Sequence, residues 1–170
     1  MYEVLIMSDS HGLTSEVEEI KHRHQLKHMI HCGDSELKYD SSEMQGLHRV
    51  AGNCDYDATY PKELQLDIGG LKFFITHGHL HRVNTGLSTI SYRAEEVGAQ
   101  IVCYGHTHFA QAKIMENQLF INPGSIRSPR GRAEKTYAVL SWQDSNDVTI
   151  QYYFPNGQAI SDMTYSFNFA

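Results

Sequence analysis

The feature that most constrains this chain is a strand ending that occurs five times. Five short apolar runs each finish in side chains that bind metal ions, and they read "VLIMSDSH", "HMIHCGD", "RVAGNCD", "FFITHGH" and "IVCYGHTH". In open α/β sheets, ligand sites form just beyond the carboxyl ends of the strands. The repetition therefore predicts that five strands bring these side chains to one edge of the fold.

The rest of the pattern places these runs in a mixed α/β chain. Helices are expected from residue 15 to about 24, where Ser15 and Glu18 form a capping box, and over 87–97, where Gly98 ends the helix. Strands are expected over 2–7, 28–31, 48–51, 64–68, 71–76, 100–104, 112–115, 119–121, 137–142, 148–154 and 164–169. A hairpin is expected at Gly69-Gly70. The last third is almost all strand, so two stacked sheets flanked by helices are predicted.

Composition limits the function classes. The 170 residues, 41% of them hydrophobic and 20% charged, predict a single globular domain over 1–170. No apolar run is long enough to span a membrane. Three cysteines without a C-x-x-C pair favour a reducing compartment, the cytoplasm, over a disulfide framework. The formal charge of −6 disfavours nucleic-acid binding.

The candidate ligands come from those five endings. They are Asp9, His11, Asp34, Asn53, His77, His106 and His108, and glycines at 33, 52, 78 and 105 allow tight turns or close approach beside them. Residues i and i+2 of extended backbone point the same way, so D-x-H and H-x-H should each aim two groups at one point.

Other candidates have plainer interpretations. The remaining histidines, at 22, 24, 28, 31 and 48, are expected on the surface or in loops, His81 is expected to be only a neighbour of the site, and Asp55 is expected to brace a turn.

This donor set indicates a transition-metal site. Carboxylate, amide and imidazole donors suit Mn²⁺, Fe, Co, Ni or Zn²⁺ better than Ca²⁺. The donors are too many for one ion, so two ions are expected, and Asp34 suits the bridging position between them. Paired ions roughly 3.5–4 Å apart hold a hydroxide at neutral pH, which can attack phosphorus in line.

The ordered set D-x-H, G-D, G-N-x-D, H-G-H, G-H-x-H resembles the calcineurin-like metallophosphoesterase superfamily. The short length, "GNCD" and "INPGS" are similar to its small YfcE-like phosphodiesterase branch, and the resemblance covers roughly Val4 to Pro129. It implies a four-layer αββα sandwich of two mixed β-sheets with a dinuclear metal site. It also implies a first ion on Asp9, His11 and His108, a second on Asn53, His77 and His106, and Asp34 between them.

One position departs from the larger relatives. Where many of them have a histidine that stabilises charge or protonates the leaving group, this chain has Cys54, and a thiol is a poor substitute at neutral pH. His79 or solvent could serve instead, or only good leaving groups could react. Alternatively, Cys54 is simply a small buried residue. Asp34, Asn53 and His79 are the predicted catalytic residues.

The segment "NPGSIRSPRGR" supplies arginines after the last expected ligand. Arg127 and Arg130 are predicted to bind phosphate oxygens, with Arg132 nearby; a solvated basic loop is the equal alternative.

The predicted function is therefore metal-dependent hydrolysis of a small phosphate ester, more specifically a phosphodiester, with Mn²⁺ expected. The alternative is a non-catalytic interaction scaffold of the same fold, resembling a retromer subunit, whose metal site is often missing a histidine. A homo-oligomer is left open.

Overall fold

In the computed structural model, which describes residues 1–169, the first apolar run forms strand β1 (Tyr2–Met7). Its side chains alternate between two hydrophobic clusters. Val4 and Ile6 belong to one cluster, whereas Leu5 and Met7 pack with Val17 of helix α1 (Ser15–His24) in the other. A strand covered on both faces needs a continuous apolar run, which explains the sequence Val-Leu-Ile-Met.

Eleven strands of the described chain form two sheets. Sheet A has the order β11-β10-β9-β1-β2-β3, where β2 is His28–His31, β3 Leu47–Arg49, β9 Tyr137–Trp142, β10 Asp147–Tyr153 and β11 Ala159–Asn168. Sheet B has the order β4-β5-β6-β8-β7, with β4 Glu63–Ile68, β5 Leu71–Thr76, β6 Ile101–Cys103, β7 Gln111–Met115 and β8 Gln118–Asn122. Both sheets contain parallel and antiparallel pairs, so both are mixed.

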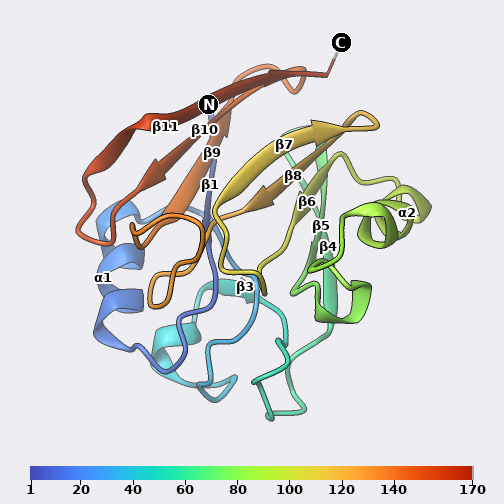
Figure 1. Cartoon of the computed structure of the whole chain (residues 1–170). Coiled ribbons are helices and arrows are strands. Elements are labelled where there is room, and N and C mark those ends of the chain that lie inside the picture. The colour runs from blue at the N-terminus through green and yellow to red at the C-terminus, as the bar shows by residue number, and fades with distance from the viewer. Residues whose placement is uncertain (170) are drawn as a thin grey trace.

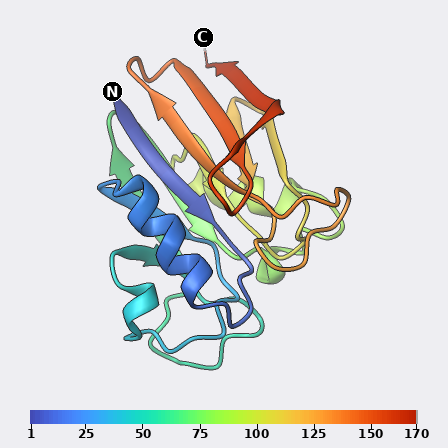
Figure 2. The same ribbon diagram turned by 90° about the vertical axis from the view of Figure 1, so that its left-hand side faces the viewer.

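The sheets stack face to face, and one helix covers the outer face of each (Figure 1). The side chains of strand β5 illustrate this layering. Phe73 and Ile75 lie in the cluster between the sheets. Phe74 lies in a third cluster, with Ile90 and Ala94 of helix α2 (Ser88–Glu96). Figure 2 shows α1 lying across sheet A beside β1. The predicted four-layer αββα sandwich is confirmed.

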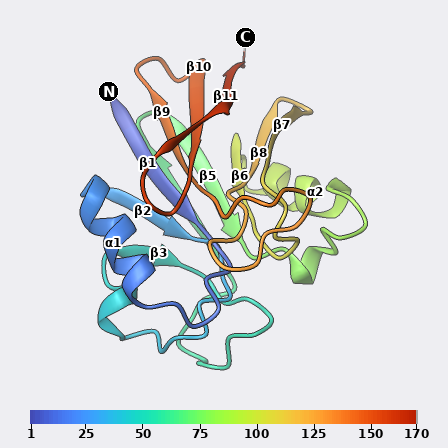
Figure 3. The same ribbon diagram turned by 60° about the vertical axis from the view of Figure 1, so that its left-hand side comes forward.

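The parallel strands decide where a site can form. In sheet A, β1, β2 and β3 run parallel, and in sheet B, β5, β6 and β8 do. The loops that follow them gather below the strands, where the long β8–β9 loop (orange) also lies (Figure 3). Two short 3₁₀ turns, Ser42–Met44 and His79–His81, lie in the connections after β2 and β5.

Several local predictions are confirmed and others are wrong. The predicted hairpin is confirmed: β4 and β5 are joined by a tight two-residue turn at Gly69 and Gly70, whose φ angles of 53° and 84° suit such a turn. The capping box is wrong, because Ser15 lies inside the helix and its hydroxyl donates to the carboxylate of Glu16. Strand β3 begins and ends earlier than expected, and β11 begins at Ala159 rather than near 164. Ala170, the last residue of the predicted single domain, lies outside the described residues.

Among the described residues, no helix has the length and apolar composition needed to cross a membrane.

The packing between the sheets generates a stability prediction. Phe73→Ala should lower the free energy of unfolding by about 3–5 kcal/mol, because it removes a fully buried ring and leaves a cavity. Urea titration of the metal-free protein measures this. Tyr92→Ala, which truncates a ring that is 68% exposed, is the control and should change stability by less than about 0.5 kcal/mol. Equal losses in the two variants would contradict the assigned core.

Candidate metal centre

Five of the seven predicted ligands lie in left-handed backbone. The φ angles are 54° at Asp9, 40° at His11, 58° at Asp34, 71° at His106 and 62° at His108. The expectation that D-x-H and H-x-H converge through extended backbone is therefore wrong. The chain turns sharply as each strand ends, and these turns bring the side chains together. Non-glycine residues in this region are strained, and such strain concentrates at functional sites.

One group of donors surrounds an oxygen of Asp9. Its Oδ1 lies 3.1 Å from Nε2 of His108 and 3.7 Å from Nε2 of His11. The same two Nε2 atoms lie 3.2 Å from each other. These three residues are the set predicted for the first ion, and the fold brings them together from the loops after β1 and β6.

A second group lies around Asp34 and His77. Nε2 of His77 is 3.1 Å from Oδ2 of Asp34 and 3.8 Å from Oδ1 of Asp9. Oδ2 of Asp34 is also 3.9 Å from Nε2 of His11, so this oxygen borders both groups. Oδ1 of Asn53 lies 3.0 Å from Nδ1 of His106, whose ring centroid is 5.2 Å from that of His77.

The outward ring nitrogens show which atoms are free to bind a metal. Nδ1 of His77 donates to the Cys32 carbonyl at 2.7 Å, and Nδ1 of His108 donates to the Ser128 carbonyl at 2.7 Å. Nδ1 of His11 lies 2.8 Å from a carboxylate oxygen of Glu36. Each of these contacts directs Nε2 to the centre, as expected of metal-binding histidines.

Two buried atoms fit a bound cation. Oδ1 of Asp9 and Nε2 of His77 are fully buried and form no hydrogen bond with any described residue. Buried polar atoms are normally hydrogen-bonded, whereas these two have only ion-pair neighbours, at 3.1 Å from His108 and Asp34 respectively, and lie 3.8 Å apart. A metal ion satisfies a carboxylate oxygen and an imidazole nitrogen at once, so the donors fit the metal that the sequence predicted.

Charge compensation at the centre is strong without a metal. Burial alone would raise the pKa of Asp9, but the imidazoles of His108, His11 and His77 hold it well below its ordinary value. The carboxylate of Asp9 in turn raises the pKa of His11 to about 9. Burial lowers the pKa of His77, but Asp34 and Asp9 outweigh it, so the net shift is upward. The imidazoles therefore supply positive charge of the kind that a metal cation would supply.

Gly105 is needed for space rather than for its backbone angles. A Cβ there would lie 2.2 Å from Oγ of Ser8 and 2.5 Å from Oδ2 of Asp9. Oδ2 of Asp9 accepts hydrogen bonds from the Ser8 hydroxyl at 2.6 Å and from the backbone N–H of His106 at 3.1 Å. Gly105 therefore lets the β6 loop approach closely enough to hold Asp9.

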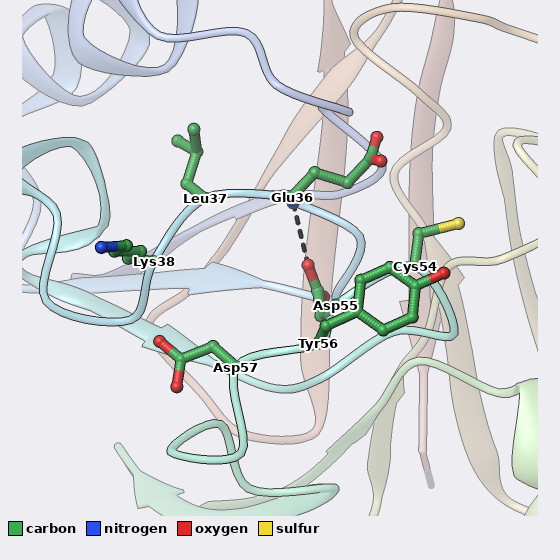
Figure 4. A pocket seen from close by; sticks show the side chains of 7 residues that line it. All are labelled: Glu36, Leu37, Lys38, Cys54, Asp55, Tyr56 and Asp57. Atoms are coloured by element: carbon green, nitrogen blue, oxygen red, sulfur yellow. Dashed lines mark hydrogen bonds between the residues drawn. The ribbon is translucent and has the colours of Figure 1, made fainter.

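Cys54 lies at the rim of the centre, beside a cavity of about 240 Å³ (Figure 4). Its backbone N–H donates to Oδ1 of Asp34 at 2.8 Å, and its sulfur accepts from the Asn53 amide at 3.6 Å. Burial and then the carboxylates of Asp34 and Glu36 raise the pKa of its thiol to about 11. The thiol is therefore neutral at pH 7, and its contacts orient Asp34 and Asn53.

Asp55 braces the turns, as expected. Its oxygens accept from the backbone N–H groups of Asp34, Gly52 and Glu36 at 2.7–2.8 Å, and the last of these is drawn in Figure 4. The loops after β2 and β3 are thereby joined.

His79 lies next to the second group of donors. Its ring centroid is 5.4 Å from that of His77 and 6.1 Å from that of His106. Burial is the main cause that lowers its pKa, and its buried Nδ1 has no partner among the described residues. His81 faces Phe74 instead, so it is a neighbour of the site, as predicted.

The arginines of the β8–β9 loop take three different positions. The Arg127 guanidinium donates to the backbone carbonyl of His11, so it lies beside the first group. Arg130 is exposed, and its backbone N–H donates to the His108 carbonyl at 2.9 Å. Arg132 forms ion pairs with Glu134 and Asp162.

Sequence reasoning missed the residues that support the ligands. His31 was expected on the surface or in a loop, but it is fully buried in β2. Its ring bonds the Ser10 hydroxyl at 2.8 Å and accepts from the Gly33 N–H at 3.1 Å, and burial lowers its pKa to about 4. Its place in the run His28–His31, just before the G-D motif, was the available signal. Nothing in the sequence pattern marked Glu36 or Ser128.

The close approach at Gly105 can be tested by Gly105→Ala. The added Cβ should displace Asp9, so we expect a folded protein whose metal content falls by at least half after loading with Mn²⁺. Elemental analysis and circular dichroism measure both properties. Gly98→Ala is the control, because a Cβ there meets nothing within 4 Å; it should keep its metal even if its backbone strain lowers stability. Full metal content in Gly105→Ala would contradict the assigned packing.

The raised imidazole pKa values predict that metal binding releases protons. The pKa of His11 is raised to about 9, so its imidazole is protonated at pH 7 without metal, and the pKa of His77 is raised as well, whereas metal-bound imidazoles must be neutral. Metal affinity should therefore rise with pH until these groups have titrated, which for His11 is near pH 9. Calorimetric titration at pH 7 in two buffers of different ionisation enthalpy should give different heats. Identical heats would show that no proton is released.

Comparisons with known proteins agree with this geometry. The calcineurin-like phosphoesterase superfamily domain matches residues 2–145. The probable metallophosphoesterase YsnB of Bacillus subtilis is 43% identical over 162 residues, covering 94% of this chain and 95% of that protein. A crystal structure of a predicted phosphoesterase from Streptococcus pneumoniae has a TM-score of 0.93 at 35% identity, covering 98% of this chain and 97% of that one.

More distant structures share the fold alone. Vacuolar Protein Sorting 29 from Cryptosporidium parvum has a TM-score of 0.78 at 19% identity, covering 98% of each chain. YfcE, a phosphoesterase from E. coli, has a TM-score of 0.68 at 19% identity, covering 98% of this chain and 100% of that one. The matched domain spans most of the chain and includes all five strand endings, so the resemblance seen in the sequence is confirmed: the chain belongs to the calcineurin-like phosphoesterase superfamily.

Proposed function

We propose that this chain is a phosphodiesterase that works with two divalent transition-metal ions. The observation that carries the proposal is a pair of buried atoms that form no hydrogen bond, Oδ1 of Asp9 and Nε2 of His77, in the midst of the predicted ligands. The mixed oxygen and nitrogen donors favour Mn²⁺, with Fe, Ni, Co or Zn²⁺ as the other candidates.

The two groups of donors divide as the family resemblance implied. Asp9, His11 and His108 would hold one ion, and Asn53, His77 and His106 would hold the other. Asp34 would lie between them, because its Oδ2 is close to His11 of the first group and to His77 of the second.

Two such ions supply a hydroxide nucleophile at neutral pH and neutralise charge that develops on phosphate oxygens. The protein's own residues would orient the ester. Arg127 is held at the rim by the His11 carbonyl, and Arg130 is exposed in the same loop, so either guanidinium is a candidate to bind phosphate oxygens in pairs.

We propose His79 as the side chain that lies nearest the leaving group. Because its pKa is lowered, it is neutral near pH 7 and is a weak proton donor there. The Cys54 thiol is also neutral. Esters with good leaving groups should therefore react fastest.

A charge count favours diesters over monoesters. Two divalent ions contribute +4, the carboxylates of Asp9 and Asp34 contribute −2, and one hydroxide contributes −1, which leaves +1. This matches the single negative charge of a diester.

The second candidate is a non-catalytic scaffold, since Vacuolar Protein Sorting 29 has the same fold. We rank it second because all seven ligand-type residues are present and lie together. We also place the protein in the cytoplasm, since Cys32, Cys54 and Cys103 are all free thiols.

Substitution of the bridging candidate tests the enzyme proposal. Wild-type protein loaded with Mn²⁺ should contain close to two ions per chain and hydrolyse bis(p-nitrophenyl) phosphate, and a chelator should abolish the activity. Asp34→Asn should lower kcat by at least about 100-fold, because one change weakens both ions. His108→Ala should mainly weaken one ion, so high Mn²⁺ should partly restore its activity.

The exposed Tyr92→Ala variant is the control for these assays and should retain wild-type turnover. Near-normal activity of Asp34→Asn would refute its bridging position. A folded wild-type protein that takes up no metal and hydrolyses no phosphate ester would leave the scaffold function in its place.

A further inference from the structure

A cavity of about 540 Å³ opens on the sheet B side of the metal centre. Its wall consists of the loop before α2, the loop after β6, and one face of the edge strand β7. On β7 the lining residues Gln111, Lys113 and Met115 alternate with residues that face away, as expected of a strand.

The cavity adjoins His106, one of the predicted ligands. Asn84 in its wall lies 3.1 Å, amide nitrogen to ring nitrogen, from Nε2 of His106. Thr107, also in the wall, lies between His106 and His108 in the chain, and its Oγ1 accepts from the Asn122 amide at 2.9 Å. A phosphate group at the centre would therefore have its ester oxygen within reach of this cavity.

Phe109 is the unusual residue of the wall. It directly follows His108, and its side chain is 47% exposed. The ring is nevertheless fixed from behind by the β8–β9 loop. Phe109 forms a backbone bridge with Arg130, and a Cβ on Gly131 would lie 2.1 Å from the ring. An exposed ring that is held in place can stack on a flat ligand at little cost in side-chain entropy.

The charge of the wall also suits a phosphate ester. Lys113 forms no ion pair with any described carboxylate, and none of the lining residues is acidic. The cavity beside Cys54 differs, since three carboxylates, those of Glu36, Asp55 and Asp57, line it against one cation, Lys38, and its net charge is unfavourable for a phosphate ester (Figure 4). The oxygens of Asp55 and Asp57 there are already engaged by backbone N–H groups.

The geometry points to the Phe109 cavity as the binding site for the organic group of the substrate, which we infer to be an aromatic or heteroaromatic ring stacked on Phe109. This inference rests on the proposed function, because it assumes that the phosphate binds at the metal centre. It extends that function by naming the class of ester that the site selects.

Binding of two monoesters tests the inference without requiring turnover. Phenyl phosphate and methyl phosphate each carry one organic group, and only the first carries a ring. Calorimetric titration of the Mn²⁺-loaded protein should give about tenfold tighter binding of phenyl phosphate, the scale typical of stacking on an aromatic side chain. In Phe109→Ala the ratio of the two dissociation constants should fall to within about twofold of one.

Two further variants serve as controls. Phe109→Trp should keep the preference for phenyl phosphate, and Tyr92→Ala, which changes an exposed aromatic residue that does not line this cavity, should keep the wild-type ratio. Equal binding of the two ligands by the wild type, no binding of either, or an unaltered ratio in Phe109→Ala would overturn the inference.

The same experiments distinguish failure of the proposed function from failure of this inference. Metal-loaded protein that prefers phenyl phosphate through Phe109 but does not hydrolyse bis(p-nitrophenyl) phosphate would support the cavity and refute the phosphodiesterase. Hydrolysis of bis(p-nitrophenyl) phosphate without a preference for phenyl phosphate would support the phosphodiesterase and refute the role of the cavity.

Discussion

The arrangement of this protein depends on two buried carboxylates, Asp9 and Asp34, held close together at the edge where two sheets meet. Burying a charge is costly unless positive charge or hydrogen bonds compensate it. Here the compensation comes from His77, His11 and His108, whose nitrogens lie within 4 Å of one or both carboxylates. The surrounding features serve this cluster, including the left-handed ligand residues, the close approach at Gly105 and the carbonyls that orient the imidazoles.

The cluster exists only when both sheets are packed. Asp9, Asp34 and Asn53 follow strands of sheet A, whereas His77 and His106 follow strands of sheet B. Metal binding at such a centre would stabilise the sandwich, because a ligand that binds only the folded state shifts the folding equilibrium. It would also link the core between the sheets to activity, since a loosened interface would separate the two sets of ligands.

The two sides of the centre differ in chemistry. On the side of Cys54, three carboxylates, one lysine and a neutral thiol line a small cavity whose acidic groups mostly bind backbone N–H groups. On the side of Phe109, the larger cavity carries no acidic residue and presents a fixed aromatic ring. In the proposed function, this difference directs the organic group of the ester toward the Phe109 cavity.

Local patterns in the sequence identify the candidate ligands and predict the layered architecture. Apolar runs that end in Asp, Asn and His are local features, and the structure places Val4, Phe73 and Ile101 of these runs in the core between the sheets. The same local reasoning failed where the backbone leaves the strand. It predicted extended D-x-H and H-x-H segments, but the ligands adopt left-handed φ angles, because only a sharp turn points them at a shared centre.

The residues that support the ligands are set by long-range packing. The buried position of His31, the contact of Glu36 with His11, and the fixed Phe109 ring all depend on segments far apart in the chain. These contacts require a particular packing distance between loops, whereas hydrophobic periodicity records only which face of an element is buried.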